Sequence, residues 1–252
     1  FSRPCPHAIA DRRSRAYAAL ARGDLEAGVS LLREVCGHAP LEPRYRMELG
    51  DMLARGDTKA RHEAAQLWRE IERSSQVTTS LRGEALERLA SEAAFRGDMT
   101  TTRELVKAAL QLPLDDAQRR QLEAKRLALD HTGPAGEMLR AYFFPPASTP
   151  GDSRQWASRA AELEPALGLT RYLRGLRQAD DGSWNAMAAD LAEALQLGLP
   201  SLSFRRNAAR RLAIAAYRAG DTSRVELAIR TLNEDGMTET DRLLAEDWRQ
   251  RL

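Results

Sequence analysis

The sequence is poor in the residues and patterns on which several protein classes depend. Of its 252 residues, 6% are aromatic and two are Cys. No stretch approaches about 18 consecutive apolar residues, so the sequence contains no transmembrane helix. No run of alternating β-branched residues occurs either, and we therefore expect no sheet.

The charges of the chain are nearly balanced. Its 38 basic and 36 acidic residues give a net charge of +2. A balance this close gives no global electrostatic reason to expect nucleic acid or an anionic membrane surface as a partner. Three of the basic residues are Lys and the rest are Arg, which we interpret as the mark of a GC-rich genome.

Motifs of catalysis and of metal binding are missing as well. The chain has no Gly-x-Ser-x-Gly elbow and no Gly-rich loop that could cradle a phosphate. Residues 62–66 differ by one residue from a zinc-protease helix, but Gln66 replaces the second His, and a neutral amide is a poor zinc ligand. We therefore expect no enzymatic activity, no metal site and no cofactor.

What the chain does contain is a recurring turn between stretches with helical apolar spacing. Ala and Leu, which are strong helix formers, provide most of the apolar positions. The turn recurs 33 residues on from Gly23 to Gly56 and 41 on to Gly97, and 38 residues separate Gly182 from Gly220. A helix–turn–helix unit with such a period is typical of an α-solenoid. The turns lie at 22–24, 55–57, 96–98 and 219–221, with a weaker one at 181–183.

The pattern predicts an all-α fold, a right-handed superhelix of about six helical hairpins with a C-terminal capping helix. We expect an irregular lead-in over residues 1–10 and about four hairpins up to residue 144. A Pro-rich joint follows over 145–151, because Pro and Gly cluster there. Further hairpins and the capping helix occupy 152–252 and continue the same solenoid.

Within the last part, a lone helix around Trp156 is expected to precede the hairpins. The apolar positions of the final hairpin include Ile214 and Tyr217. Thr238 and Asp241 have the spacing of a capping box that opens the final helix.

These repeats resemble the tetratricopeptide repeat (TPR) family. The resemblance covers most of the chain and is weakest around 131–165. It is carried in the first repeat by Gly23, Asp24, Leu25, Leu32 and Pro40, in the third by Leu89, Ala90, Gly97, Asp98, Ala109 and Pro113, in the fifth by Gly175, Trp184 and Ala194, and in the last by Ala215, Gly220, Asp221 and Ile229. The resemblance implies protein or peptide binding on a concave face that the first helices line.

In that family, residues about ten positions before the turn glycine face the concave side. Three of the five residues at such positions here are Arg, which suits the bidentate capture of carboxylates. We therefore hypothesise that the groove binds an acidic segment or a peptide C-terminus. The alternative is that the residues at these positions are solvated and that Arg is simply abundant in this chain. The candidate peptide-binding residues are Arg13, Arg46, Glu87, Tyr172 and Arg210, together with Arg218 two residues before a turn glycine.

Two other short motifs allow more than one interpretation. The three Arg-Gly-Asp triplets are interpreted as helix caps, since Gly ends one helix and Asp begins the next, rather than as adhesion motifs. Cys5 and Cys36 each precede a His by two positions, and they could form a disulfide, bind zinc weakly or remain free thiols. A disulfide would favour an oxidising, extracytoplasmic (periplasmic) compartment over the cytoplasm.

Two functional hypotheses follow. The first is a non-catalytic interaction scaffold within a multi-component, envelope-associated assembly, with a protein or peptide partner. The second is a regulatory or substrate-docking module excised from a larger enzyme or membrane protein. The start at Phe1 rather than Met leads us to expect a processed or excised chain. Self-assembly through the groove or the end helix is a third possibility.

Overall fold

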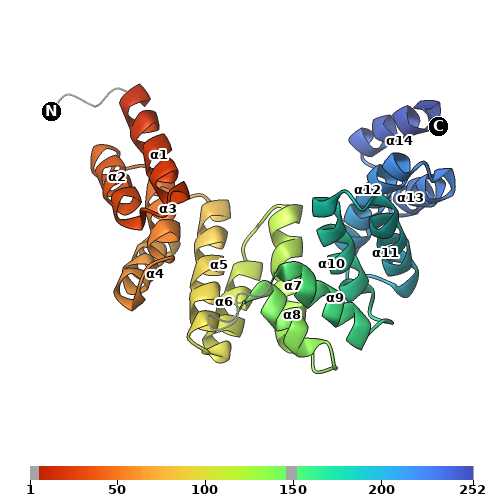
Figure 1. Ribbon diagram of the computed structural model, residues 1–252, viewed down its shortest axis with the longest axis horizontal. Coiled ribbons are helices and arrows are strands. Elements are labelled where there is room, and N and C mark those ends of the chain that lie inside the picture. The colour runs from red at the N-terminus through yellow and green to blue at the C-terminus, as the bar shows by residue number, and fades with distance from the viewer. Residues whose placement is uncertain (1–5, 146–151, 252) are drawn as a thin grey trace. The chain divides into compact units, whose positions relative to one another are not determined.

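The computed structural model describes residues 6–145 and 152–251, which fold into helices and turns with no strand in those ranges (Figure 1). The chain divides into two compact units between Glu123 and Ala124, inside α7. The first unit contains α1 (Pro6–Ala21), α2 (Leu25–His38), α3 (Pro43–Leu53), α4 (Thr58–Arg73), α5 (Thr79–Phe95), α6 (Met99–Leu110) and the beginning of α7 (Asp116–Asp130). The second contains the rest of α7, then α8 (Gly136–Phe143), α9 (Ser153–Leu163), α10 (Gly168–Gln178), the short 3-10 turn η1 (Ala179–Asp181), α11 (Trp184–Leu197), α12 (Leu202–Ala219), α13 (Thr222–Glu234) and α14 (Glu239–Arg251). The expected all-α solenoid of helical hairpins is thereby confirmed.

The recurring turns close the hairpins through local backbone chemistry. Gly23, Gly97 and Gly220 have φ angles of 84°, 79° and 71°, a left-handed conformation that L side chains rarely adopt. The amide that follows each glycine donates a hydrogen bond to the carbonyl five residues earlier, which satisfies the end of the first helix. The carboxylates of Asp24, Asp57, Asp98 and Asp221 then accept a hydrogen bond from the first turn of the second helix.

The core of the first unit lies between the helices of successive hairpins. α1 packs on α2, α3 on α4 and α5 on α6, and α2–α3 and α4–α5 contacts join the pairs. Large side chains such as Leu32, Met52, Trp68 and Ile71 are buried among alanines that let the helix axes approach. Each such side chain stabilises the fold by about 1.5–3 kcal/mol.

The second unit has a core of its own, in which α10 packs on α11 and α12 packs on both α11 and α13. Phe204 of α12 is fully buried and meets the Tyr172 ring edge-to-face at 5.5 Å. The helix around Trp156, which we expected to be isolated, is α9 and packs against both α8 and α10. Its alanines at 157, 160 and 161 form the buried face that makes these contacts.

The predictions for the lead-in, the capping box and the Pro-rich joint have three different outcomes. The lead-in was predicted too long, because α1 already begins at Pro6, where a helix needs no backbone N–H donor. The capping box is confirmed, since the amide of Asp241 donates to the Thr238 hydroxyl and the amide of Thr238 donates to the Asp241 carboxylate. The predicted joint falls mostly on residues 146–151, outside the described residues, and stays a prediction.

The close approach of α10 to the end of α11 depends on Gly168. A Cβ atom there would collide with the carbonyl oxygen of Gly198 and lie 3.0 Å from that of Ala194, and backbone atoms cannot rotate away. We expect Gly168→Ala to lower the free energy of unfolding by about 1–3 kcal/mol, measured by urea denaturation followed by circular dichroism.

The matched control for Gly168→Ala is Gly37→Ala in α2, where a Cβ atom would meet nothing within 4 Å. Because alanine loses less backbone entropy than glycine in a helix, this variant should be neutral or more stable by up to about 1 kcal/mol. Equal effects of the two substitutions would contradict the packing assigned to Gly168.

Candidate functional site

The first helices of the first unit are joined by bidentate ion pairs. Arg13 of α1 donates to both carboxylate oxygens of Glu48 in α3, at 2.6 and 2.8 Å. In the same way, α3 and α5 are joined by Arg44–Glu84 and by Asp51–Arg88. The charges of these arginines are therefore compensated inside the chain, and the pairs connect one hairpin with the next.

The structure places the three first-unit candidates in different surroundings. The guanidinium of Arg13 bonds Glu48, whose hydrogen bonds raise the pKa of Arg13. Arg46 instead lies 3.8 Å from Glu70 of α4, and its buried Nε has no hydrogen-bond partner in the described chain. Glu87 accepts a hydrogen bond from the amide of Gln121 at 2.5 Å.

Cys36 is half-buried at the end of α2, and this burial raises the pKa of its thiol. Cys5 lies outside the described residues, so the disulfide stays a prediction. Within the described ranges, no group of three or more His, Cys, Asp or Glu side chains could hold a metal ion. None of the helices described is long and apolar enough to cross a membrane.

Two candidates of the second unit have structural roles. Tyr172 was predicted to face a groove, but it is 3% exposed, and its hydroxyl donates to Asn207 of α12 at 2.7 Å. It therefore belongs to the core and to the contact between α10 and α12. Arg210 donates to both carboxylate oxygens of Asp241, at 2.5 and 2.8 Å, and so attaches α14 to α12.

An exposed stripe on α12 differs from these compensated positions. Ile214 and Tyr217 are 45% and 37% exposed, although their apolar character predicted a packing role. Arg211 and Arg218 lie three positions before and four after Ile214, so they share its face of the helix. We call Arg211, Ile214, Tyr217 and Arg218 the α12 stripe.

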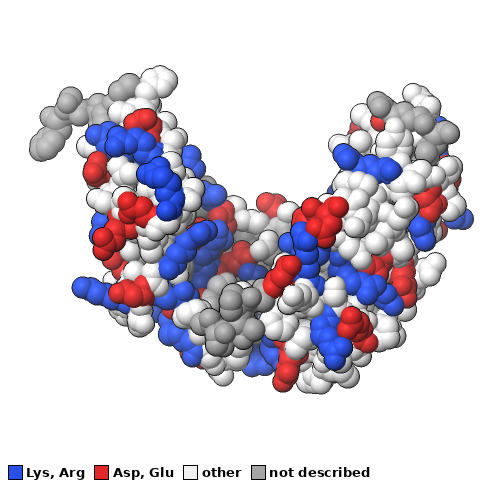
Figure 2. Space-filling model, viewed as in Figure 1, with Lys and Arg blue, Asp and Glu red and all other residues white. Residues whose placement is uncertain are grey.

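The two arginines of the α12 stripe have no carboxylate partner in the described part of the chain. Arg211 donates to the amide oxygen of Asn207 at 3.3 Å, and Arg218 lies 4.6 Å from the centre of the Trp184 ring. Elsewhere, acidic and basic side chains are interspersed over the visible face of each unit (Figure 2). The α12 stripe therefore combines uncompensated positive charge with exposed apolar surface.

The buried carboxylate of Asp241 has a consequence for stability. Hydrogen bonds from Arg210 and then from Thr238 lower its pKa from the ordinary value of 3.8 to about 2. A carboxylate with a lowered pKa in the folded state stabilises the fold above about pH 4, and this contribution is lost as the pH falls towards 2. We expect Asp241→Asn to lower the free energy of unfolding by about 2 kcal/mol at neutral pH, measured by urea denaturation.

The same substitution should also weaken the dependence of stability on pH in the acid range. Glu246→Gln removes an exposed carboxylate of the same helix and should leave both the stability and its pH dependence nearly unchanged. An equal loss in the two variants, or an Asp241→Asn variant with the parent's acid sensitivity, would contradict the assignment.

No family model and no curated protein matches the sequence. Solved structures that are similar to it include the TPR2AB domain of yeast Sti1 in complex with pHSP90, with 12% identity and a TM-score of 0.39 over 98% of this chain and 95% of that one. Another is the TPR domain of P58(IPK), with 14% identity, a TM-score of 0.36, and 96% and 64% covered. A third is a tetratricopeptide repeat protein from Parabacteroides merdae, with 13% identity, a TM-score of 0.38, and 96% and 99% covered. These values carry no argument about function, and the TPR-like solenoid fold of the chain rests on its own capped hairpins.

Proposed function

We propose that the chain is a non-catalytic protein–protein interaction module. It binds an acidic, partly apolar protein segment on the α12 stripe, which lies on the first helix of the last hairpin. The observation that carries this proposal is the α12 stripe, where Arg211 and Arg218 without carboxylate partners flank the exposed Ile214 and Tyr217. Aromatic residues and arginines at the centre of an interface contribute the largest share of binding energy.

The ion pairs of the other candidate arginines support the choice of the α12 stripe as the binding surface. The positive charges of Arg13 and Arg210 are already neutralised by Glu48 and Asp241, so an acidic ligand would have to break those pairs. Among the described residues, the Trp184 ring is the contact found for the Arg218 guanidinium, so a partner carboxylate can reach it without such a loss. Capture of that carboxylate would add directional hydrogen bonds to the burial of Ile214 and Tyr217.

The proposal also fits the kind of structure in which the α12 stripe lies. Stacked hairpins present long helix faces to a partner, and they bind peptides by placing apolar anchors and charges at fixed helical spacing. An acidic helix or extended segment with one or two aliphatic side chains matches the stripe in both charge and polarity.

Site-specific photo-crosslinking in the organism of origin tests the proposal. A photoreactive phenylalanine analogue at Tyr217 should form a defined covalent adduct with a partner protein, detected by mobility shift and identified by mass spectrometry. Arg211→Glu combined with Arg218→Glu should reduce the adduct roughly 10-fold or more, because two charge-assisted contacts are replaced by repulsion.

The matched control places the same analogue at Leu197, which is 40% exposed at the end of α11, a second helix. No adduct with the same partner is expected from that position. The same adduct from both positions, or none from Tyr217, would contradict binding on the α12 stripe.

A further inference from the structure

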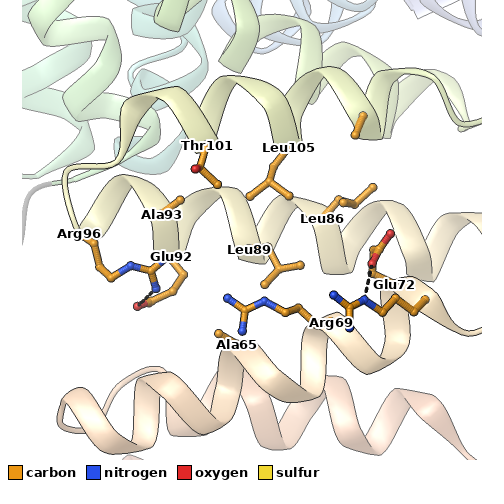
Figure 3. A pocket seen from close by; sticks show the side chains of 12 residues that line it. Ala65, Arg69, Glu72, Leu86, Leu89, Glu92, Ala93, Arg96, Thr101 and Leu105 are labelled. Carbon is orange, nitrogen blue, oxygen red and sulfur yellow. Dashed lines mark hydrogen bonds and ion pairs between the residues drawn. The ribbon is translucent and has the colours of Figure 1, made fainter.

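The second helices α4 and α6 flank a pocket whose floor is α5 (Figure 3). The pocket has a volume of about 300 Å³, at the lower end of the range of ligand-binding sites. Leu86, Leu89 and Ala93 of α5 form its floor, and Leu105 of α6 forms one wall. An aliphatic side chain entering the pocket would therefore meet apolar surface on two sides.

Arg69 of α4 lines this pocket, and Figure 3 shows its side chain pointing toward Leu89. Arg69 as a residue is partly buried, and its guanidinium has no hydrogen-bond or ion-pair partner in the described ranges. Arg96 across the pocket is held at 3.2 Å by Glu92, and Glu92 also accepts from Arg61. Arg69 is thus a cation whose charge no neighbouring carboxylate compensates, above an apolar floor.

The neighbouring groove between α2 and α4 shows what the α4–α6 pocket lacks. There, Arg33 of α2 donates to both carboxylate oxygens of Glu63 in α4, at 2.9 and 2.8 Å, and bridges the two helices. Arg33 lies nine residues after its N-cap Asp24, and Glu63 lies six residues after its N-cap Asp57. This pair compensates charge and spans the groove.

The equivalent positions one hairpin further on cannot form such a bridge. Nine residues after Asp57 stands Gln66, and six residues after the N-cap Asp98 stands Glu104. Gln66 carries no charge, and its amide lies 3.2 Å from the His62 ring of its own helix. Neither Gln66 nor Glu104 is among the residues that line the α4–α6 pocket, and no ion pair joins α4 to α6 in the described part of the chain.

We propose that this pocket binds a peptide segment that places a carboxylate on Arg69 and a neighbouring aliphatic side chain between Leu86, Leu89 and Leu105. Charge complementarity selects the acidic group, because three arginines line the pocket against two glutamates, and Arg61 already shares one of those glutamates. The apolar floor selects an aliphatic neighbour. None of the described residues that line the pocket is aromatic, which disfavours the base stacking that single-stranded nucleic acid requires.

This site is independent of the α12 stripe, because it lies on the second helices of the other unit. Binding at one can therefore be removed without removing binding at the other, and the failure of either proposal leaves the other intact.

A random 12-residue peptide library displayed on phage tests the proposal, with the full chain immobilised as bait. We expect enrichment of peptides in which Asp or Glu stands next to Leu, Ile or Val. Synthetic copies of these peptides should bind the full chain in calorimetric titrations and lose roughly 10- to 100-fold in affinity on Arg69→Glu, because a charge-assisted contact is replaced by repulsion. Arg69→Gln, which keeps the length of the side chain, should show a smaller loss in the same direction.

Lys59→Glu is the matched control, since it makes the same charge reversal on α4 but lines the groove shared with α2. It should retain the affinity of the parent chain, and all three variants should show its circular dichroism and thermal transition. A labelled single-stranded oligonucleotide is titrated in parallel. The proposal is overturned if no acidic–aliphatic peptide is enriched, if Arg69→Glu and Lys59→Glu bind those peptides equally well, or if the oligonucleotide alone binds in an Arg69-dependent manner.

Discussion

The structure depends first on the turn that closes each hairpin. A helix end leaves carbonyl groups without partners, and the left-handed Gly23, Gly97 and Gly220 let the following amides satisfy them within one turn of chain. The aspartate after each glycine then caps the next helix. Because both ends are satisfied locally, two alanine-rich helices can pack face to face, and the cores of both units are built from such pairs.

The second organising feature is the use of arginine within the chain. The bidentate pair Arg13–Glu48 joins the first hairpin to the second, and Arg210–Asp241 joins α14 to α12. Both pairs neutralise an arginine charge that would otherwise be available to a ligand. The two binding sites that we propose lie where this pattern of pairing is interrupted. Arg69 and the α12 stripe are such interruptions, one in each unit, and both combine an uncompensated guanidinium with apolar surface.

The fold was predictable from the sequence to a greater extent than the candidate site was. The turns and the capping box of Thr238 depend on neighbouring residues, so a short stretch of sequence contains the whole interaction. The candidates Arg13 and Arg210 were chosen by their distance from a turn, but their carboxylate partners stand 35 and 31 residues later. That separation is close to the length of one repeat. A carboxylate one repeat after each arginine was therefore the sequence signal that could have identified Arg13 and Arg210 as ion-paired.

The sequence by itself determined that the chain is helical, where most hairpins turn, and how each second helix begins, because these properties follow from the preferences of a few adjacent residues. Only the tertiary structure decided which polar side chains are compensated and which apolar ones are exposed. Tyr172 is buried and Ile214 exposed although both have helical apolar spacing, because burial depends on the helix that packs opposite. Likewise, Arg33 is paired with a carboxylate of a neighbouring helix and Arg69 is not, and the sequence around each arginine does not show which residues a neighbouring helix places beside it.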